Sequence, residues 1–159
     1  MVLYYLAMED AKSIYYMNIA LEEAALALKE GEVPVGAVLV KNDQIIAKAH
    51  NHKEAKHDVS SHAEIEAIRA AGERLSTWDL KGCTLYVTLE PCLMCAGAIE
   101  QSRISTLVYG ADDPQNGSIT SKRCVFDIDN PNASMLIYRG VEKVRCERIL
   151  QDFFLTKRN

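Results

Sequence analysis

Hydrophobic and polar positions along the chain predict an amphipathic helix near each end. Between residues 12 and 30, apolar residues recur at steps of three and four, which is the period of one face of a helix. They are Ile14, Met17, Leu21, Ala24, Ala25 and Leu28. Gly31 follows and is suited to end this helix. The same period returns over residues 146–157 and predicts a final helix. Its expected inward-facing residues are Ile149, Leu150, Phe153 and Phe154.

Four apolar segments between these helices are typical of strands. The first, "VPVGAVLV" at residues 33–40, is nearly continuous and β-branched, as in a buried strand. The turn-forming "KND" follows, so "QIIAKAH", residues 44–50, is expected to return as a hairpin. The other two are "CTLYVTL", residues 83–89, and "ISTLVYG", residues 104–110. Residues 111–140 are rich in Asp, Asn, Pro and Ser, and we expect turns or a short helix there at most.

Two further helices are predicted between the strands. One begins near His62 in "HAEIEAIRAAG", and its expected inner face is Ile65, Ile68 and Leu75. The other is "PCLMCAGAIEQS", residues 91–102. The order of elements implies a mixed sheet with helices on both faces, in three layers. Right-handed crossovers would place these two helices side by side, beginning at the same edge of the sheet.

Length and composition favour one globular domain over residues 1–159. The chain is 48% hydrophobic and 25% charged, which is ordinary for a soluble protein. The longest nearly apolar run is residues 33–40, far shorter than the roughly 20 residues of a membrane helix. The N-terminal "MVLYYLAM" has no preceding basic stretch, and Glu9 and Asp10 follow it at once. We therefore predict no signal peptide and a cytoplasmic location.

The chain has five cysteines, at positions 83, 92, 95, 124 and 146. An odd number without a secretory signal argues against a disulfide framework and favours a reducing compartment. Cys92 and Cys95 form a CxxC pair at the start of a predicted helix, where the helix dipole favours thiolate. Such a pair can be a redox dithiol, half of a zinc site or two buried structural cysteines. The spacing alone does not choose among these.

His62 favours the zinc interpretation. A histidine at a helix start is usually a surface or capping residue, but this helix is predicted to lie beside the CxxC helix. His62, Cys92 and Cys95 would leave the fourth tetrahedral position open for water, which is the pattern of catalytic zinc. A closed structural site would need a further ligand such as Cys83 or His57.

Glu64 is the candidate catalyst. It stands two residues after His62, so its carboxylate could take a proton from an activated water and pass it to a leaving group. The alternative is an ordinary first-turn glutamate that favours the helix dipole. Glu66 has the same chemistry two residues further on and is expected to point away from the site.

"HAE" followed by "EPCLMCAGAI" resembles the H-x-E…P-C-x-x-C signature of the zinc-dependent nucleobase deaminases. "EVPVGAVLV", "HN", "TLYVTLEPCLMCAGAI", "SRI", "VYGA" and the final "FF" are similar to the bacterial tRNA-specific adenosine deaminases. The resemblance covers residues 16–113 closely, together with the last helix. It implies a cytidine deaminase-like α/β fold with three layers, α/β/α, in which the central layer is a mixed five-stranded sheet.

The resemblance also implies a role for each matching residue of the catalytic centre. His62, Cys92 and Cys95 would bind one zinc ion per subunit, and Glu64 would shuttle protons. The implied reaction is hydrolytic deamination of adenosine to inosine at the wobble position of a tRNA anticodon, by zinc-activated water.

Three more matching residues would meet the substrate. Asn51 would hydrogen-bond the flipped nucleoside, the backbone of Ala63 would meet the base edge, and Asp113 would contact the nucleotide. The implied partners are a tRNA anticodon stem-loop and a second subunit of a homodimer, with no membrane. A loop nucleotide is already unpaired, so presenting its base costs less than opening a duplex.

Charge leaves other readings open. A net charge of −4 counts mildly against RNA, because phosphate contacts need clustered Lys and Arg. The candidate basic contacts are Lys122, Arg123, Lys157 and Arg158, and for each of them plain solvation is the more typical role. The alternative function is a small-molecule deaminase of the same fold, acting on guanine, cytosine or a nucleoside such as cytidine. A non-catalytic zinc or RNA-binding module is a third reading, against which Glu64 argues.

Overall fold

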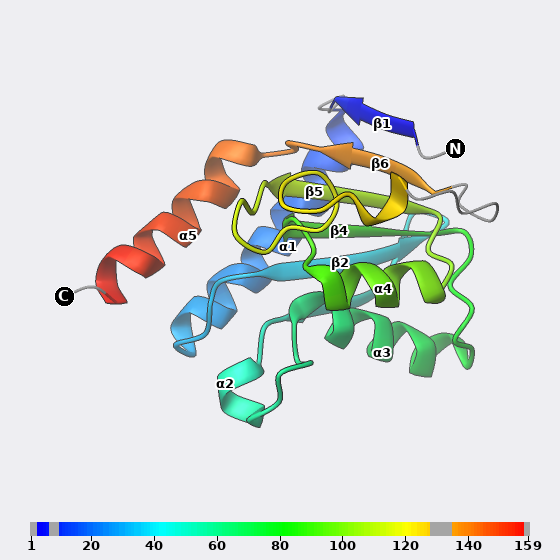
Figure 1. Cartoon of the computed structure of the whole chain (residues 1–159). Coiled ribbons are helices and arrows are strands. Elements are labelled where there is room, and N and C mark those ends of the chain that lie inside the picture. The colour runs from blue at the N-terminus through cyan, green and yellow to red at the C-terminus, as the bar shows by residue number, and fades with distance from the viewer. Residues whose placement is uncertain (1–2, 7–9, 128–134, 158–159) are drawn as a thin grey trace.

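One mixed sheet of six strands forms the centre of the molecule (Figure 1). The computed structural model describes residues 3–6, 10–127 and 135–157, with the backbone alone for residues 3–6 and 127. The strands are β1 Leu3–Leu6, β2 Gly36–Lys41, β3 Gln44–His50, β4 Cys83–Leu89, β5 Thr106–Ala111 and β6 Leu136–Arg139. Their order in the sheet is β1-β6-β5-β4-β2-β3. Strand β2 is antiparallel to both of its neighbours, and the other strand pairs are parallel.

Helices cover both faces of this sheet. They are α1 Ala11–Lys29, α2 Lys53–Lys56, α3 Ala63–Leu75, α4 Leu93–Gln101 and α5 Lys143–Lys157, with a short 3-10 helix, η1, at Val125–Asp127. Helices α3 and α4 lie side by side on one face, and α1 and α5 cover the other (Figure 1). The three-layer α/β/α fold with its mixed sheet is thus confirmed. None of the helices in the described part of the chain is both long and apolar enough to cross a membrane.

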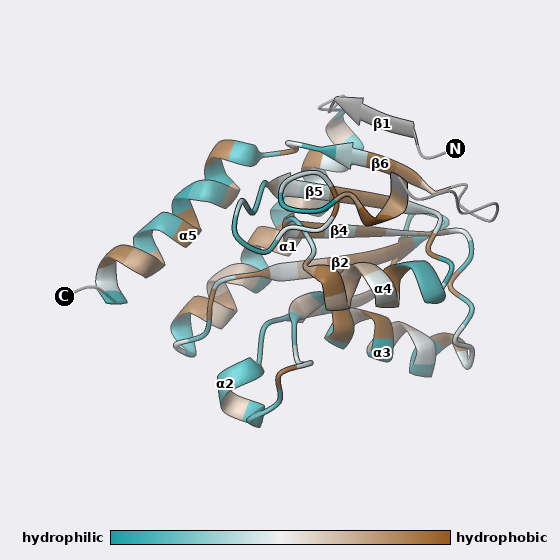
Figure 2. Ribbon diagram, in the orientation of Figure 1, coloured by the Kyte–Doolittle hydropathy of each residue, from teal (hydrophilic) through white to brown (hydrophobic). Residues whose placement is uncertain are grey.

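Helix α3 faces the sheet through alanines. Ala63, Ala67 and Ala71 recur every four residues and are fully buried. Ile68 and Leu75, which were expected on the inner face, are partly buried and pack at the margin of this core cluster. Small side chains on the buried face let the helix backbone approach the strands closely. The brown central strands of Figure 2 mark the apolar layer that results.

The opposite face is covered by Met17, Ala20 and Leu21 of α1 and by residues of α5. Two expectations for these helices are wrong. Leu28, near the end of α1, is 37% exposed. Phe154 is 49% exposed although Phe153 is only 6% exposed, because consecutive helix positions point about 100° apart.

Strands β1 and β6 were not predicted from the hydrophobic pattern. Strand β6 lies within residues 111–140, for which turns or a short helix were expected. It pairs in parallel with β5, where Leu107 is opposite Ile137, and β1 pairs with its other edge. Each of these two strands has four residues, too few to display a period of two clearly. Strand β1 adds a sixth strand beside the five that were expected.

One edge of the sheet collects the polar residues that follow the strands. Strands β3, β4 and β5 end there and β2 begins there, because Gly36 is opposite His50 and Leu89 is opposite Ala111. Helix α4 starts directly after β4 at this edge. In open α/β sheets, ligands bind outside the carboxyl ends of the parallel strands. The topology therefore directs attention to the residues after β3, β4 and β5.

Close approach of α1 to β2 predicts a large cost for a methyl group at Gly36. A β-carbon there would overlap the carbonyl oxygen of Ala20 and lie 2.6 Å from the amide nitrogen of Ala24. We expect Gly36→Ala to lower the free energy of unfolding by about 1–3 kcal/mol or more. Urea denaturation measures it.

Gly97 provides the matched control, because a β-carbon there meets no atom of the described residues within 4 Å. It lies inside α4, so Gly97→Ala should be neutral or stabilise by up to about 1 kcal/mol. Equal effects of the two substitutions would contradict the packing described for α1 and β2.

Candidate metal centre and substrate pocket

His62, Cys92 and Cys95 converge at the edge of the sheet where the strands end. His62 Nδ1 lies 3.6 Å from Cys92 Sγ and 3.5 Å from Cys95 Sγ. Ligands at tetrahedral angles, with Zn–S about 2.3 Å and Zn–N about 2.0–2.1 Å, would be separated by roughly 3.6 Å. The three side chains therefore form a group that could hold a metal ion.

Helix starts bring these side chains together. His62 is the N-cap residue of α3 and Cys92 is the N-cap residue of α4, both with extended backbone angles. Among the described residues, neither side chain makes a capping hydrogen bond to its own helix, so both can turn toward the space between the helices. Cys95 is one turn further into α4 and is buried. His62 and the two cysteines are therefore close in space because α3 and α4 start side by side.

The pKa values of the two cysteines are shifted in opposite directions. A hydrogen bond with Cys95, together with one to His62, lowers the pKa of Cys92 to about 4. The pKa of Cys95 is strongly raised, first by its contact with the Cys92 thiolate and then by burial. The hydrogen bond to Cys92 also raises the pKa of His62. A thiolate beside an imidazole in this state attracts a cation, and a bound metal ion would displace the thiol proton of Cys95.

Glu64 is buried beside this group, with 4% of its surface exposed. Burial raises the pKa of its carboxyl group, although a contact with Cys95 lowers it in part. A carboxyl group in this state can hold a proton at higher pH than an exposed glutamate can. Glu66 points elsewhere, as expected: its carboxylate accepts hydrogen bonds from Ser61 Oγ at 2.5 Å and Lys56 Nζ at 2.9 Å.

A pocket of about 760 Å³ opens beside the candidate metal ligands. His62, Cys92 and Glu64 line it, together with all three residues expected to meet a substrate, Asn51, Ala63 and Asp113. Four apolar lining residues are exposed to solvent, namely Val59, Leu93, Met94 and Phe154. The volume suits a small ligand, and the exposed apolar residues could contact a flat ring.

Asn51 and Asp113 are fixed by their own loops. Asn51 donates through Nδ2 to the Val33 carbonyl at 3.3 Å and accepts from the Lys53 amide at 3.0 Å. Asp113 Oδ1 accepts from the amides of Gln115 and Asn116, each at 3.1 Å. Each side chain retains further hydrogen-bonding capacity, since a carboxylate or amide oxygen has two lone pairs and an amide nitrogen two hydrogens. Both could therefore contact a ligand without losing these bonds.

Glu90 is a residue of this site that the sequence analysis missed. It is 2% exposed and lies between β4 and the CxxC helix. Oε1 accepts hydrogen bonds from the amides of Ile119 at 3.2 Å, Thr120 at 2.6 Å and Ser121 at 2.9 Å. Oε2 accepts from the Asp113 amide at 2.9 Å and from Ser121 Oγ at 2.5 Å. One buried carboxylate therefore holds the whole loop of residues 113–121.

This loop forms one wall of the pocket. Asp113, Gln115 and Asn116 line the pocket, and Gly117 forms a bridge with Cys92. Burial would raise the pKa of Glu90, but hydrogen bonds from Ser121, Asp113 and Thr120 outweigh it and hold the pKa below its usual range. The signal that could have identified Glu90 is a charged residue directly after a buried strand, where only dense hydrogen bonding permits burial.

The candidate basic contacts separate into different groups. Arg123 and its neighbour Lys122 are both exposed, but only Arg123 of the two lines the pocket. Lys157 Nζ lies 5.4 Å from the ring centroid of Phe153 in α5. Arg158 lies outside the described residues. Phe154, wrongly expected in the core, lines the pocket instead. Arg123 and Phe154 are therefore the residues of this region that could meet a ligand.

The role of Glu90 predicts a specific effect of Glu90→Gln. An amide of the same shape loses the charge and directs an NH₂ group at backbone donors, so we expect a loss of about 1–3 kcal/mol of stability. The amides of Thr120 and Ser121 should exchange with solvent faster, and the metal content should remain unchanged. Hydrogen exchange followed by mass spectrometry measures the loop directly.

Acid provides a second measure of the same interaction. Because the pKa of Glu90 is lowered on folding, its stabilisation is complete above about pH 4.3, the ordinary value. It is lost as the pH falls through the lower folded value. Glu90→Gln should remove this part of the acid dependence, and Glu73→Gln, at an exposed position of α3, should not. Unchanged exchange of residues 119–121 in Glu90→Gln would contradict the role assigned to Glu90.

Comparisons with known proteins identify the family. The model of the MafB19-like deaminase family matches residues 11–158. The tRNA-specific adenosine deaminase of Bacillus subtilis (strain 168) is 45% identical over 139 residues, which are 87% of this chain and 86% of the relative.

Solved structures agree with this result. One from studies of A-to-I editing by tRNA:A34 deaminases, at the wobble position of transfer RNA, aligns with a TM-score of 0.82 and 43% identity. The alignment covers 86% of this chain and 99% of that one. A guanine deaminase from Bacillus subtilis aligns with a TM-score of 0.60 and 34% identity, over 74% of this chain and 76% of its own. The chain therefore belongs to the deaminase family that contains the bacterial tRNA-specific adenosine deaminases.

Proposed function

We propose that this protein deaminates adenosine to inosine at the wobble position of a tRNA anticodon, by hydrolysis. The observation that carries the proposal is the convergence of His62, Cys92 and Cys95 beside the buried Glu64, at a pocket large enough for a nucleoside. The similarity to tRNA-specific adenosine deaminases over most of the chain supports the choice of substrate.

The metal assigned to the site is one zinc ion per subunit, with His62, Cys92 and Cys95 as its ligands. Two thiolates and one imidazole suit zinc, and the distances between the ligand atoms fit tetrahedral coordination. Three protein ligands leave one position for water. When bound, zinc supplies a nucleophile at neutral pH, because it lowers the pKa of water to roughly 7.

Glu64 moves the protons in the proposed reaction. Hydrolysis adds the oxygen of water to the adenine ring carbon that bears the amine, and ammonia leaves. The Glu64 carboxylate takes one proton of the attacking water and gives it to the adjacent ring nitrogen. It then takes the remaining proton from the hydroxyl group added to the ring carbon and transfers it to the departing amine, which leaves as ammonia. Burial raises the pKa of Glu64, which favours a carboxyl group that accepts and returns protons near neutral pH.

The remaining proposed contacts hold the nucleoside. Asn51 hydrogen-bonds the nucleoside, the Ala63 backbone at the start of α3 meets the base edge, and Asp113 contacts the nucleotide from the opposite loop. All three line the same pocket as Glu64. Because Glu90 fixes the loop that carries Asp113, the pocket wall is formed before the substrate arrives.

An anticodon loop fits this site for physical reasons. Its bases are unpaired, so one can enter the pocket at low cost. The exposed Phe154 and Met94 offer surfaces for neighbouring bases, and Arg123 offers a charge for a phosphate.

We also propose, from the family resemblance, a cytoplasmic homodimer whose groove uses both subunits. Light scattering after gel filtration measures the mass of the particle.

A small-molecule deaminase is the second candidate, favoured by the similarity to a guanine deaminase. Mass spectrometry separates the two. Zinc-loaded protein is given an anticodon stem-loop with adenosine at the wobble position, and in parallel free adenosine, cytidine, cytosine and guanine. Inosine in the stem-loop alone supports the proposal. Turnover of a free base or nucleoside with the stem-loop untouched moves the protein to the second candidate.

Separate substitutions of Glu64 and Glu66 test whether Glu64 transfers protons in the reaction. Glu64→Gln should retain zinc and stability but lower inosine formation by about 10²–10⁴-fold, the size of a general acid–base contribution. Glu66→Gln is the matched control, because Glu66 bonds Ser61 and Lys56 instead. Zinc is counted by elemental mass spectrometry. Comparable turnover in the two variants would exclude the role proposed for Glu64.

A second matched pair tests the contact with RNA. Arg123→Ala should weaken stem-loop binding and reduce the slope of log Kd against log salt by about 1, as the loss of one phosphate contact does. Lys122→Ala should change neither, although it removes the same charge one residue away. Fluorescence anisotropy at several salt concentrations measures both. If the two variants lose affinity equally, Arg123 has no specific role and only the net charge matters.

A further inference from the structure

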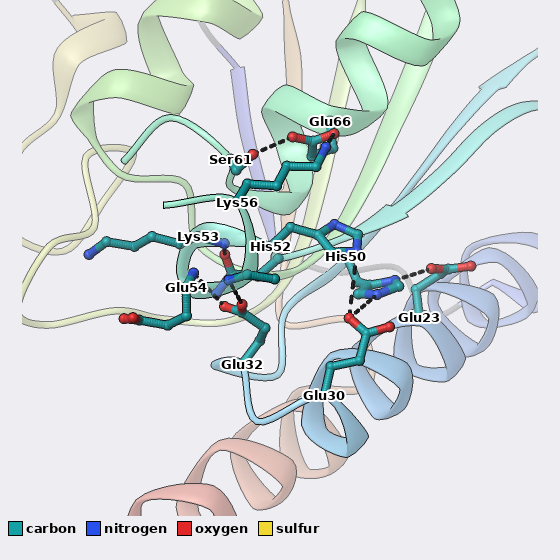
Figure 3. A network of polar contacts seen from close by, with 12 residues as sticks. Glu23, Glu30, Glu32, His50, His52, Lys53, Glu54, Lys56, Ser61 and Glu66 are labelled. Atoms are coloured by element: carbon teal, nitrogen blue, oxygen red, sulfur yellow. Dashed lines mark hydrogen bonds and ion pairs between the residues drawn. The ribbon is translucent and has the colours of Figure 1, made fainter. Parts of the chain in front are cut away.

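A second group of potential metal ligands lies outside the pocket, between the end of α1 and the end of β3 (Figure 3). It consists of Glu30, His50 and His52. Glu30 is the C-cap residue of α1, His50 is the last residue of β3, and His52 precedes α2. In Figure 3, His50 lies between Glu23 and Glu30, and the ring of His52 lies beside it. No step of the proposed deamination uses these residues.

The ligand atoms are spaced as they would be around one ion. Glu30 Oε2 is 3.0 Å from His50 Nε2 and 3.5 Å from His52 Nε2. The candidate ligand atoms of the three residues all lie within 4.8 Å of one another. Nitrogen and oxygen ligands at about 2.0–2.2 Å from a tetrahedral zinc ion would be separated by roughly 3.4 Å. The two distances to Glu30 lie on either side of that value.

His52 is poorly explained by the protein's own hydrogen bonds. The distance of 3.5 Å between its Nε2 atom and Glu30 Oε2 is longer than a normal N–H···O bond. The ring nevertheless stays beside His50, with 4.3 Å between the two centroids. An ion shared with Glu30 and His50 would account for a ring that faces Glu30 without bonding to it.

Glu23 supplies the support that a metal-binding histidine usually has. Its Oε2 atom lies 2.7 Å from His50 Nδ1, and both side chains are largely buried. When this carboxylate accepts the Nδ1 proton of the histidine, the lone pair of Nε2 is free to bind an ion. Nε2 is the atom that faces Glu30, so the orientation of His50 suits metal binding.

We propose that Glu30, His50 and His52 bind a second divalent transition-metal ion, in a site separate from the catalytic one. Two imidazoles and one carboxylate favour zinc, copper or nickel over magnesium and calcium, which prefer oxygen ligands. Water would complete the coordination. Because none of its ligands is a thiolate, this site should bind zinc more weakly than the catalytic centre does.

The proposed ion would also restrain Asn51, a residue of the substrate pocket. Asn51, which lines the pocket, stands between the two proposed histidine ligands. The backbone N–H of Asn51 donates to the Val35 carbonyl at 3.2 Å, and the backbone N–H of His52 donates to the Ser61 carbonyl at 3.0 Å. An ion held by His50, His52 and Glu30 would tie this segment to the end of α1. Asn51 would then be held in place by the ion as well as by its backbone hydrogen bonds.

Zinc counting tests the proposal in the full-length protein. Wild type and variants are dialysed against the same buffered free zinc, well above the concentration that saturates the catalytic site, and zinc per chain is measured by elemental mass spectrometry. We expect two ions in wild type and one in His52→Gln and in Glu30→Gln. His57→Asn, at an exposed histidine one turn away, should retain two.

Glu23→Gln provides a sharper test, because it leaves all three ligands in place. The second ion should bind about 10–100-fold more weakly, while the catalytic ion is unchanged. Circular dichroism verifies that each variant is folded.

The same contacts also suit a protonated His50 held between two carboxylates with no metal. One ion per wild-type chain would support that alternative and overturn the proposal, as would two ions in folded His52→Gln. Because no substrate is present, the result is independent of whether the protein deaminates tRNA.

Discussion

The approach of two helix N-termini at one edge of the sheet is the constraint on which the whole site depends. His62 and Cys92 occupy the N-cap positions of α3 and α4, and Cys95 follows one turn later. Their side chains meet only because the alanine face of α3 lies close on the sheet, beside α4. Hydrogen bonds with Cys95 and His62 lower the pKa of Cys92 to about 4, and a helix N-terminus favours the same thiolate. Packing on the sheet and chemistry at its edge therefore have the same structural cause.

Buried glutamates organise the loops around this edge. Glu90 accepts several hydrogen bonds from residues 113–121, and Glu32 accepts two from the backbone amides of Glu54 at 3.1 Å and Ala55 at 2.7 Å (Figure 3). Both carboxylates are fixed by donors; Glu90 holds the loop of residues 113–121 in place, and Glu32 holds the short helix α2. Glu64 is buried with Cys95 and its own backbone as its hydrogen-bond partners, rather than a set of loop amides, and burial raises its pKa. The same side chain thus serves as a loop anchor where donors surround it, and is suited to proton transfer where they do not.

Local periodicity predicted much of the fold, including all four helices that cover the sheet and strands β2 to β5. It failed for β1 and β6, which form only by pairing with strands distant in sequence. It also misplaced Phe154, since helical period alone cannot tell a core position from the wall of a pocket. Among the site residues, His62, Glu64, Cys92 and Cys95 could be nominated from the sequence, because their motifs resemble the signature of the zinc-dependent deaminases. Glu90 could not, because its importance comes from a loop that begins more than twenty residues later and folds back over it.

The most direct test of the central claim is the X-ray absorption spectrum of the protein loaded with one equivalent of zinc. Coordination by Cys92, Cys95, His62 and water predicts two sulfur ligands at about 2.3 Å and two nitrogen or oxygen ligands at about 2.0–2.1 Å. Removal of either cysteine should lower the sulfur count. A spectrum with nitrogen and oxygen ligands alone, or with four protein ligands and no place for water, would contradict the proposed catalytic centre.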